Sequence, residues 1–200
     1  MNPLKKIRIQ GFKSIVDQEF EPGQVNILIG ANGSGKTALL EAIGLLSAAM
    51  NGRVDNNALQ GRGVRLGTPQ LYKSAFKGGI EAQSIHLSFQ WQDEQRNDKS
   101  EYSVTLENSN QSPSAWSYQA EDFRLNDKLI MQHCPSEENG RNNATQKVHF
   151  GARHGIGFEA IYRRIENNRL QDFLEALKSY AIYSPTTPAL RDLITDITPL

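Results

Sequence analysis

The feature that most constrains this chain is a spacing of residues: Gly30, then four residues, then Gly35, Lys36 and Thr37. A short apolar run, residues 25–29, precedes the spacing, and a long apolar stretch follows it. A glycine-rich turn between a strand and a helix, closed by a lysine and a hydroxyl residue, is the pattern of a phosphate-binding loop. The spacing therefore predicts an α/β fold built around one strand, one loop and one helix.

The start of the helix explains why such a loop binds anions. N–H groups of the first turn have no partner inside the helix, and the positive end of the helix dipole lies there. A loop folding back over this end adds inward N–H groups that surround anionic oxygens. Gly30, Gly33 and Gly35 permit the close approach and the unusual backbone angles. Lys36 then supplies a charge for the β- and γ-phosphates, and Thr37 a hydroxyl for Mg²⁺.

The first fifty residues predict a compact unit of strands and one helix. Residues 5–10 alternate between apolar and polar, and residues 15–20 can pair with them as a hairpin. Residues 25–29 are short and mostly apolar, which is typical of a strand buried on both faces of a sheet. Residues 36–50 are apolar nearly all round, so they predict a buried helix, ended by the pair Asn51-Gly52.

The remainder predicts an antiparallel meander and then a helix. Alternating runs separated by polar connectors occur at residues 81–92 (most clearly from 84), 102–107 and, more weakly, 116–120. Residues 135–147 contain no large apolar side chain and predict a mobile loop. Apolar residues from 158 to about 179 recur at helical spacing, and residues 180–185 predict a short strand.

Composition narrows the function classes. Lys plus Arg and Asp plus Glu both number 22, so the formal charge is zero and gives no global case for nucleic acid or an anionic membrane. The single Cys134 excludes an internal disulfide and suits a reducing compartment. No leader pattern is visible, and no apolar run approaches the roughly 20 residues of a membrane span. We expect a soluble cytoplasmic protein with no membrane partner.

Three segments resemble one family. They are "GANGSGKT" (30–37), "IRIQGFKSI" (7–15) and "VNILIGANGSGKTALLEAIGLL" (25–46), and all three resemble the ABC-type ATPases of the RecF, SMC and OLD-nuclease group, found in bacterial repair and phage defence. The resemblance is strong over residues 4–50, weaker over the meander and suggestive at residues 181–192. It implies the N-terminal lobe of an ABC-type P-loop head with an antiparallel β subdomain.

That resemblance also implies a domain division and site roles. Residues 4–52 would form the nucleotide-binding core, 80–150 an antiparallel lobe, and 156–200 a helix and strand leading to a C-terminal half. Asn32 would lie nearest the γ-phosphate of ATP, Lys36 would act in catalysis and Thr37 would hold Mg²⁺. Lys13 and Ser14 would lie near the base and sugar. The implied nucleotide-binding set is Gly30, Asn32, Gly33, Ser34, Gly35, Lys36, Thr37, Ala38, Lys13 and Ser14.

Other parts of the family pattern are not found in the sequence. No run of four apolar residues ends in Asp-Glu, and no "LSGG"-like segment occurs. The resemblance also implies a glutamine that touches the metal. Gln60 and Gln70 lie in the expected region, and the sequence does not decide between them. We therefore interpret the chain as the N-terminal half of a longer ATPase, inactive alone. The resemblance implies a homodimer or higher oligomer, with DNA or a nuclease as partner.

Two alternative functions fit the same loop. One is a small-molecule or nucleotide kinase, although a kinase would place its lid and acceptor site on helices rather than on a meander. The other is a subunit that binds nucleotide without hydrolysing it, which the missing acidic pair favours.

Several further residue groups have ordinary structural interpretations. The His133, Cys134, His149 and His154 spacing does not match known metal motifs. The arginines of a basic stretch that runs into the predicted C-terminal helix suit a solvated face better than contact with DNA phosphates. The aromatic residues on the meander suit its core better than base stacking. These residues are Arg153, Arg163, Arg164, Arg169, Trp91, Trp116 and Tyr118.

Overall fold

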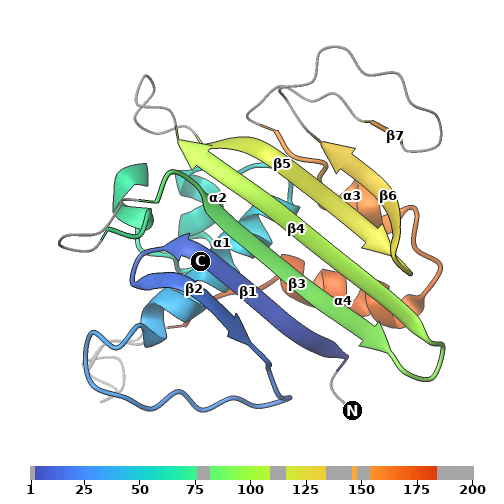
Figure 1. The fold of residues 1–200 in the computed structure, drawn as a ribbon, viewed down its shortest axis with the longest axis horizontal. Coiled ribbons are helices and arrows are strands. Elements are labelled where there is room, and N and C mark those ends of the chain that lie inside the picture. The colour runs from blue at the N-terminus through green and yellow to red at the C-terminus, as the bar shows by residue number, and fades with distance from the viewer. Residues whose placement is uncertain (1–2, 76–81, 109–115, 134–145, 148–153, 184–200) are drawn as a thin grey trace, which may run out of the picture.

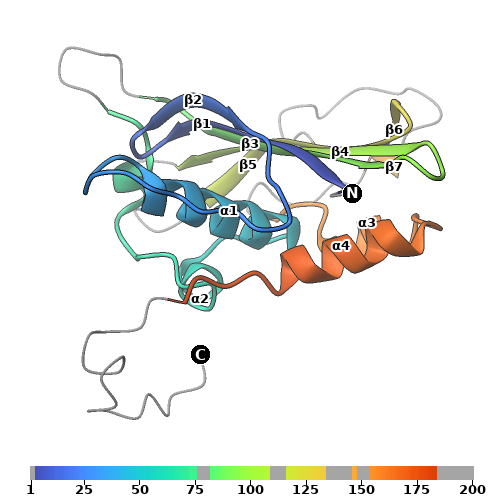
Figure 2. The same ribbon diagram turned by 90° about the horizontal axis from the view of Figure 1, so that it is seen from below.

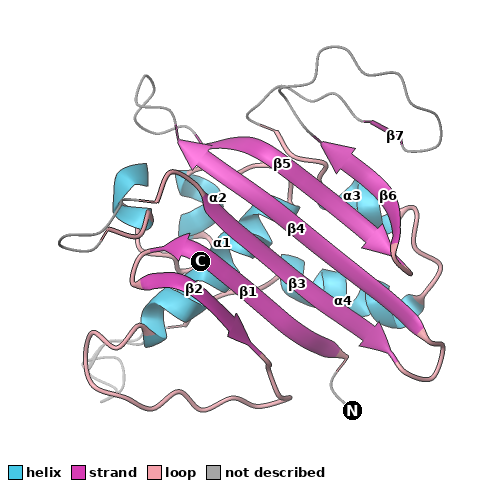
Figure 3. Cartoon of the chain, in the orientation of Figure 1, coloured by secondary structure: helices cyan, strands magenta, loops and turns pink. Residues whose placement is uncertain are grey.

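A single twisted sheet with helices on one face forms the molecule (Figures 1 and 2). The structure is a computed structural model and describes residues 3–75, 82–108, 116–133, 146–147 and 154–183. Its strands are β1 (Leu4–Phe12), β2 (Ile15–Phe20), β3 (Ile85–Asp93), β4 (Asp98–Asn108), β5 (Trp116–Leu125), β6 (Lys128–His133) and β7 (Gln146–Lys147). Its helices are α1 (Lys36–Met50), α2 (Asn56–Gln60), the 3₁₀ turn η1 (Pro69–Tyr72), α3 (Phe158–Tyr162) and α4 (Asn168–Lys178). Figure 3 separates the two kinds of element by colour.

The strand order is β2-β1-β3-β4-β5-β6-β7, and every neighbouring pair is antiparallel except β6 with β7. The predicted meander is therefore confirmed. β1 pairs with β2 along one edge and with β3 along the other, with Ile7 opposite both Phe20 and Phe89. The N-terminal hairpin and the meander consequently form one continuous sheet.

The core lies between the sheet and the helices. Alternate residues of β1, β3 and β4 turn inward, as the period of two requires. The inward set is Ile7, Ile9, Ile85, Leu87, Phe89, Trp91, Tyr102, Val104 and Leu106, all buried. Trp116 and Tyr118 are buried as well, so the meander's aromatic residues pack the core as expected.

Helix α1 has the predicted bounds and the predicted burial. Ala42, Leu45 and Leu46 are at most 1% exposed, and the helix ends where Asn51 N–H donates to the Ala48 carbonyl. Gly52 follows with a φ of 81°, the left-handed angle that suits glycine after a helix. The predicted C-terminal helix is instead two helices, α3 and α4, separated at residues 163–167.

Two strand predictions are wrong. Residues 25–29 form no strand, and Val25, Ile27 and Ile29 are 82%, 81% and 90% exposed. A strand buried on both faces needs neighbours, whereas among the described residues β1 is already paired on both edges and no strand pairs with residues 25–29. Residues 180–183 likewise form no strand; Ile182 N–H donates to the Arg62 carbonyl at 2.9 Å.

The loop prediction at residues 135–147 falls outside the described residues except for Gln146–Lys147 in β7. None of the helices that the structure describes has the length and apolar character needed to cross a bilayer.

The start of α4 provides a stability prediction. The Asn167 side chain accepts hydrogen bonds from the N–H groups of Arg169 and Leu170, and its amide donates to Asp98 at 2.7 Å. We expect Asn167→Ala to lower the free energy of unfolding by about 1–2 kcal/mol, because a helix cap and a bond to a carboxylate are both lost. Urea unfolding measures this. The matched control is Asn168→Ala, the adjacent exposed residue, and equal losses in the two variants would contradict the prediction.

Candidate nucleotide-binding site

The glycine loop before α1 contains backbone angles that favour glycine. Gly33 and Gly35 adopt φ angles of 83° and 93°, in the left-handed region that residues with a Cβ rarely enter. Gly35 occupies the position before the helix and has no side chain to cap the first-turn N–H groups. The loop and the helix start therefore leave main-chain donors accessible to an anion.

Lys36 closes the loop rather than extending into solvent. Its ammonium donates to the carbonyl oxygens of Gly30 and Ala31 at 2.7 and 2.8 Å, and to the Ser34 hydroxyl at 3.3 Å. A Cβ on Gly30 would lie 2.8 Å from that hydroxyl, so the absence of a side chain there lets the loop fold tightly. The lysine and the loop form a single preorganised unit.

The other predicted loop residues differ in how far their side chains are exposed to solvent. Asn32, Ser34 and Thr37 are exposed, so their polar side chains are accessible from the loop side. Ala38 is only 6% exposed, and its methyl group belongs to the core. Any contact that Ala38 makes with a ligand would come from its N–H group.

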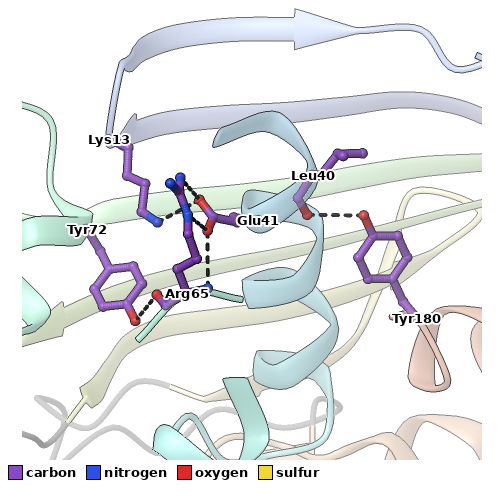
Figure 4. A network of polar contacts seen from close by, with 6 residues as sticks. All are labelled: Lys13, Leu40, Glu41, Arg65, Tyr72 and Tyr180. Atoms are coloured by element: carbon purple, nitrogen blue, oxygen red, sulfur yellow. Dashed lines mark hydrogen bonds and ion pairs between the residues drawn. The ribbon is translucent and has the colours of Figure 1, made fainter. Parts of the chain in front are cut away.

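Lys13 and Ser14 form the turn between β1 and β2, which lies against the loop. A Cβ on Gly35 would be 3.1 Å from the Ser14 hydroxyl, so this turn and the loop are in close proximity. The Lys13 ammonium, however, donates to Glu41 Oε2 at 2.6 Å (Figure 4). The structure thus brings both residues beside the loop and shows that the Lys13 charge is already paired.

Glu41 is a residue at this site to which sequence reasoning gave no role. It lies on α1, one turn after Thr37, and is fully buried. Arg65 donates to it through Nε at 2.7 Å, Nη2 at 3.1 Å and its own main-chain N–H at 3.1 Å. Burial raises the pKa of Glu41, but the hydrogen bonds from Arg65 and Lys13 outweigh it, and the pKa lies below its ordinary value.

The signal for Glu41 was the narrow polar stripe of α1. Glu41, Gly44 and Ser47 interrupt an otherwise apolar helix, and all three pack against residues 62–65. The Ser47 hydroxyl accepts from Arg62 Nε at 2.7 Å, and a Cβ on Gly44 would lie 2.6 Å from Val64. A polar stripe on a buried helix therefore marks a packed polar contact here, not a solvent face.

The remaining candidates belong to other elements or fall outside the described part of the chain. Gln60 and Gln70 are exposed, in α2 and η1. Arg169 pairs with Asp93 at 3.2 Å, and Arg164 donates to the Ala160 carbonyl. Cys134, His149 and Arg153 fall among the residues that are not described. In the described ranges, no group of three or more His, Cys, Asp or Glu could bind a metal ion.

A glycine loop closed by its lysine at the start of a buried helix, beside an antiparallel sheet, defines the N-terminal lobe of an α/β P-loop NTPase. The family model described as "AAA domain" matches residues 6–184, and the chain belongs to this family. Together with the relatives below, the match identifies the N-terminal region of an ABC-type P-loop ATPase of the RecF/SMC-like group, as the sequence predicted.

Several curated relatives carry the name "DNA replication and repair protein RecF". The protein from Vibrio vulnificus is 46% identical over 72 residues, which cover 35% of this chain and 19% of the relative. The protein from a Marinomonas species is 50% identical over 46 residues, covering 22% and 12%, and one from an Arthrobacter species is 46% identical over 57 residues, covering 28% and 14%. The matched stretch is thus at most a fifth of each of these relatives.

Proposed function

We propose that this chain binds Mg-ATP at residues 30–37 and, completed by the remaining part of an ABC-type ATPase, works as a nucleotide-driven switch of RecF/SMC-like type. The observation that carries the proposal is the placement of the Lys36 ammonium within the loop, 2.7 Å from the Gly30 carbonyl. The charge and the N–H groups at the start of α1 thus belong to one loop, and we expect both to act on the same anion.

Each loop residue has a proposed role in that complex. The N–H groups of Gly33 and of residues 35–37 bind the β- and γ-phosphates, and the Asn32 side chain lies nearest the γ-phosphate. Lys36 stabilises the charge that develops during transfer, and the Thr37 hydroxyl is a Mg²⁺ ligand. Bound Mg²⁺ would neutralise charge on the phosphate oxygens. Catalysis of phosphoryl transfer is mainly positioning and charge stabilisation, which these groups can provide.

Residues 25–29 support the view that further parts of the ATPase complete this site. Val25, Ile27 and Ile29 alternate with Asn26 and Leu28, and all three are more than 80% exposed. Apolar β-prone residues in this number are seldom left in water. We propose that this segment becomes a buried strand when paired with strands from the remaining part, which would also bring the acidic pair missing here.

Partners and location are a further part of the proposal. We propose a dimer or higher oligomer closed over bound nucleotide, working in the cytoplasm. The relatives are named for DNA replication and repair, so DNA is the proposed target. A nuclease partner and a role in phage defence are two further proposals.

The test compares nucleotide binding with and without Mg²⁺. We expect the folded chain to bind Mg-ATP in calorimetry, and phosphate release to need the complete assembly. Thr37→Val should lower Mg-ATP affinity about tenfold, and the remaining affinity should no longer depend on Mg²⁺, because the hydroxyl ligand is gone. The matched control is Thr68→Val, another exposed threonine, which should leave both values unchanged.

Three results would contradict parts of this proposal. No heat with Mg-ATP, from a folded preparation of the complete assembly, would exclude nucleotide binding at the loop. Full ATPase turnover by the isolated chain would contradict the claim that essential groups lie elsewhere. Phosphoryl transfer to a small acceptor would support the kinase alternative instead.

A further inference from the structure

A cluster of charges is centred on the buried Glu41, one helical turn after the phosphate loop on α1. The two carboxylate oxygens accept four hydrogen bonds: Oε1 from Arg65 Nε and the Arg65 main-chain N–H, and Oε2 from Lys13 Nζ and Arg65 Nη2. The Glu41 side chain is 1% exposed and that of Lys13 18%, whereas that of Arg65 is 70% exposed. Because Glu41 is buried and each of its oxygens accepts two hydrogen bonds, Lys13 and Arg65 together compensate its charge.

Within this cluster, Lys13 belongs to the β1–β2 turn, which lies against the phosphate loop. Lys13 adopts a φ of 48°, a left-handed angle that is costly for a residue with a Cβ, so its surroundings must hold it there. Its N–H donates to the Tyr72 carbonyl at 2.8 Å, and its carbonyl accepts from the Ser74 hydroxyl at 2.7 Å. The next residue is Ser14, whose hydroxyl faces Gly35 at the start of α1.

The side chain of Lys13 is as constrained as its backbone. Its ammonium lies 4.9 Å from the centre of the Tyr72 ring and 5.4 Å from that of Phe12, and it ends on Glu41 (Figure 4). The Lys13–Glu41 ion pair therefore connects helix α1 to the β1–β2 turn. Glu41 lies one helical turn after the end of the phosphate loop. Arg65 contacts the same carboxylate through its guanidinium. Its carbonyl accepts a hydrogen bond from the Tyr72 hydroxyl at 2.9 Å, a main-chain contact that a side-chain substitution leaves in place.

We propose that Glu41 is a positioning residue for the phosphate loop: through Lys13 it holds the β1–β2 turn against Gly35 and so preserves the loop conformation that binds nucleotide. This inference rests on the proposed function for its effect on affinity. Its structural part, the hold of Glu41 on the loop, can be measured without any nucleotide.

The experiment uses the full chain and four variants: Glu41→Gln, Lys13→Met, their double variant, and Arg65→Met as matched control. Mg-ATP affinity is measured by calorimetry. We expect about tenfold weaker binding in each of the first two single variants and no further loss in the double variant, because both break one link. Arg65→Met removes a contact of Glu41 that leaves Lys13 in place, so its affinity should stay within about twofold.

Amide hydrogen exchange provides the readout that is independent of nucleotide. Lys13 N–H bonds to the Tyr72 carbonyl, and Ser34 N–H bonds to the Ala31 carbonyl at 3.2 Å, so both amides report local order. We expect faster exchange at both amides in Glu41→Gln and Lys13→Met, but not in Arg65→Met.

The outcomes separate this inference from the proposed function. If the unsubstituted chain binds no nucleotide, the proposed function fails, and the exchange data alone decide the role of Glu41. Unchanged exchange and affinity in folded Glu41→Gln would overturn the inference. Tighter binding in Glu41→Gln would also overturn it, because Lys13 would then act on the nucleotide directly once released. If Glu41→Gln does not fold, Lys13→Met is tested against the same criteria.

Discussion

Replacing Lys36 with alanine is expected to weaken Mg-ATP binding by roughly ten- to a hundredfold. The substitution removes a charge-assisted contact of about 1.5–3 kcal/mol with the phosphates. It also removes the three hydrogen bonds by which the ammonium closes the loop on Gly30, Ala31 and Ser34. In the complete assembly the loss of turnover should exceed the loss of affinity, because charge on the transferred group grows in the transition state. Calorimetry and phosphate release measure the two effects.

Two further variants make the Lys36 result specific. Lys128→Ala removes the same charge from an exposed position on β6 and should leave affinity unchanged. Lys36→Arg keeps the charge but replaces a compact ammonium with a planar guanidinium, and it should also lose most of the affinity. Equal binding by Lys36→Ala and the unsubstituted protein would exclude the loop as the phosphate site.

Glu121→Gln is expected to remove a large dependence of stability on pH. Glu121 lies in the sheet on β5 and is fully buried. It accepts a hydrogen bond from the Tyr102 hydroxyl at 2.7 Å and another from Ile156 N–H. Burial raises the pKa of Glu121 to about 7, and the nearby Asp122 adds to the increase, while the two hydrogen bonds oppose it.

The sign follows from linkage between proton binding and folding. The folded state holds the Glu121 proton more tightly than the unfolded state, whose carboxyl has the ordinary pKa of 4.5. The stabilising contribution is complete below pH 4.5 and is lost as pH rises through 7. The full difference is roughly 3 kcal/mol at 1.36 kcal/mol per pKa unit. Glutamine has the same shape as glutamate and no titratable proton. The stability of Glu121→Gln should therefore not fall between pH 4.5 and pH 7.

Denaturant unfolding between pH 5 and pH 8 measures the effect as the difference between the two proteins. The matched control is Glu101→Gln on the adjacent strand β4, at a residue that is only partly buried. That variant should keep the pH dependence of the unsubstituted protein. If Glu121→Gln kept it too, the carboxyl would not be the group responsible.

Much of the fold could be predicted from patterns spanning a few residues. The alternation in β1, β2 and the meander, and the apolar stretch of α1 with its Asn51-Gly52 end, were recognisable because side-chain direction repeats every two or 3.6 residues. The loop was recognisable because few residue types allow a φ of 93° at Gly35. Each of these features depends on short stretches of chain.

Other features depend on which distant segments meet. Residues 25–29 have the composition of a buried strand, yet they are exposed because no described strand lies beside them. Glu41 looks like a surface charge, yet it is buried because Lys13 and Arg65, 28 and 24 residues away, supply its counter-charges. Hydrogen bonds and ion pairs between segments have no local period. Composition and spacing therefore identified the phosphate loop and its helix, whereas long-range packing established what surrounds them.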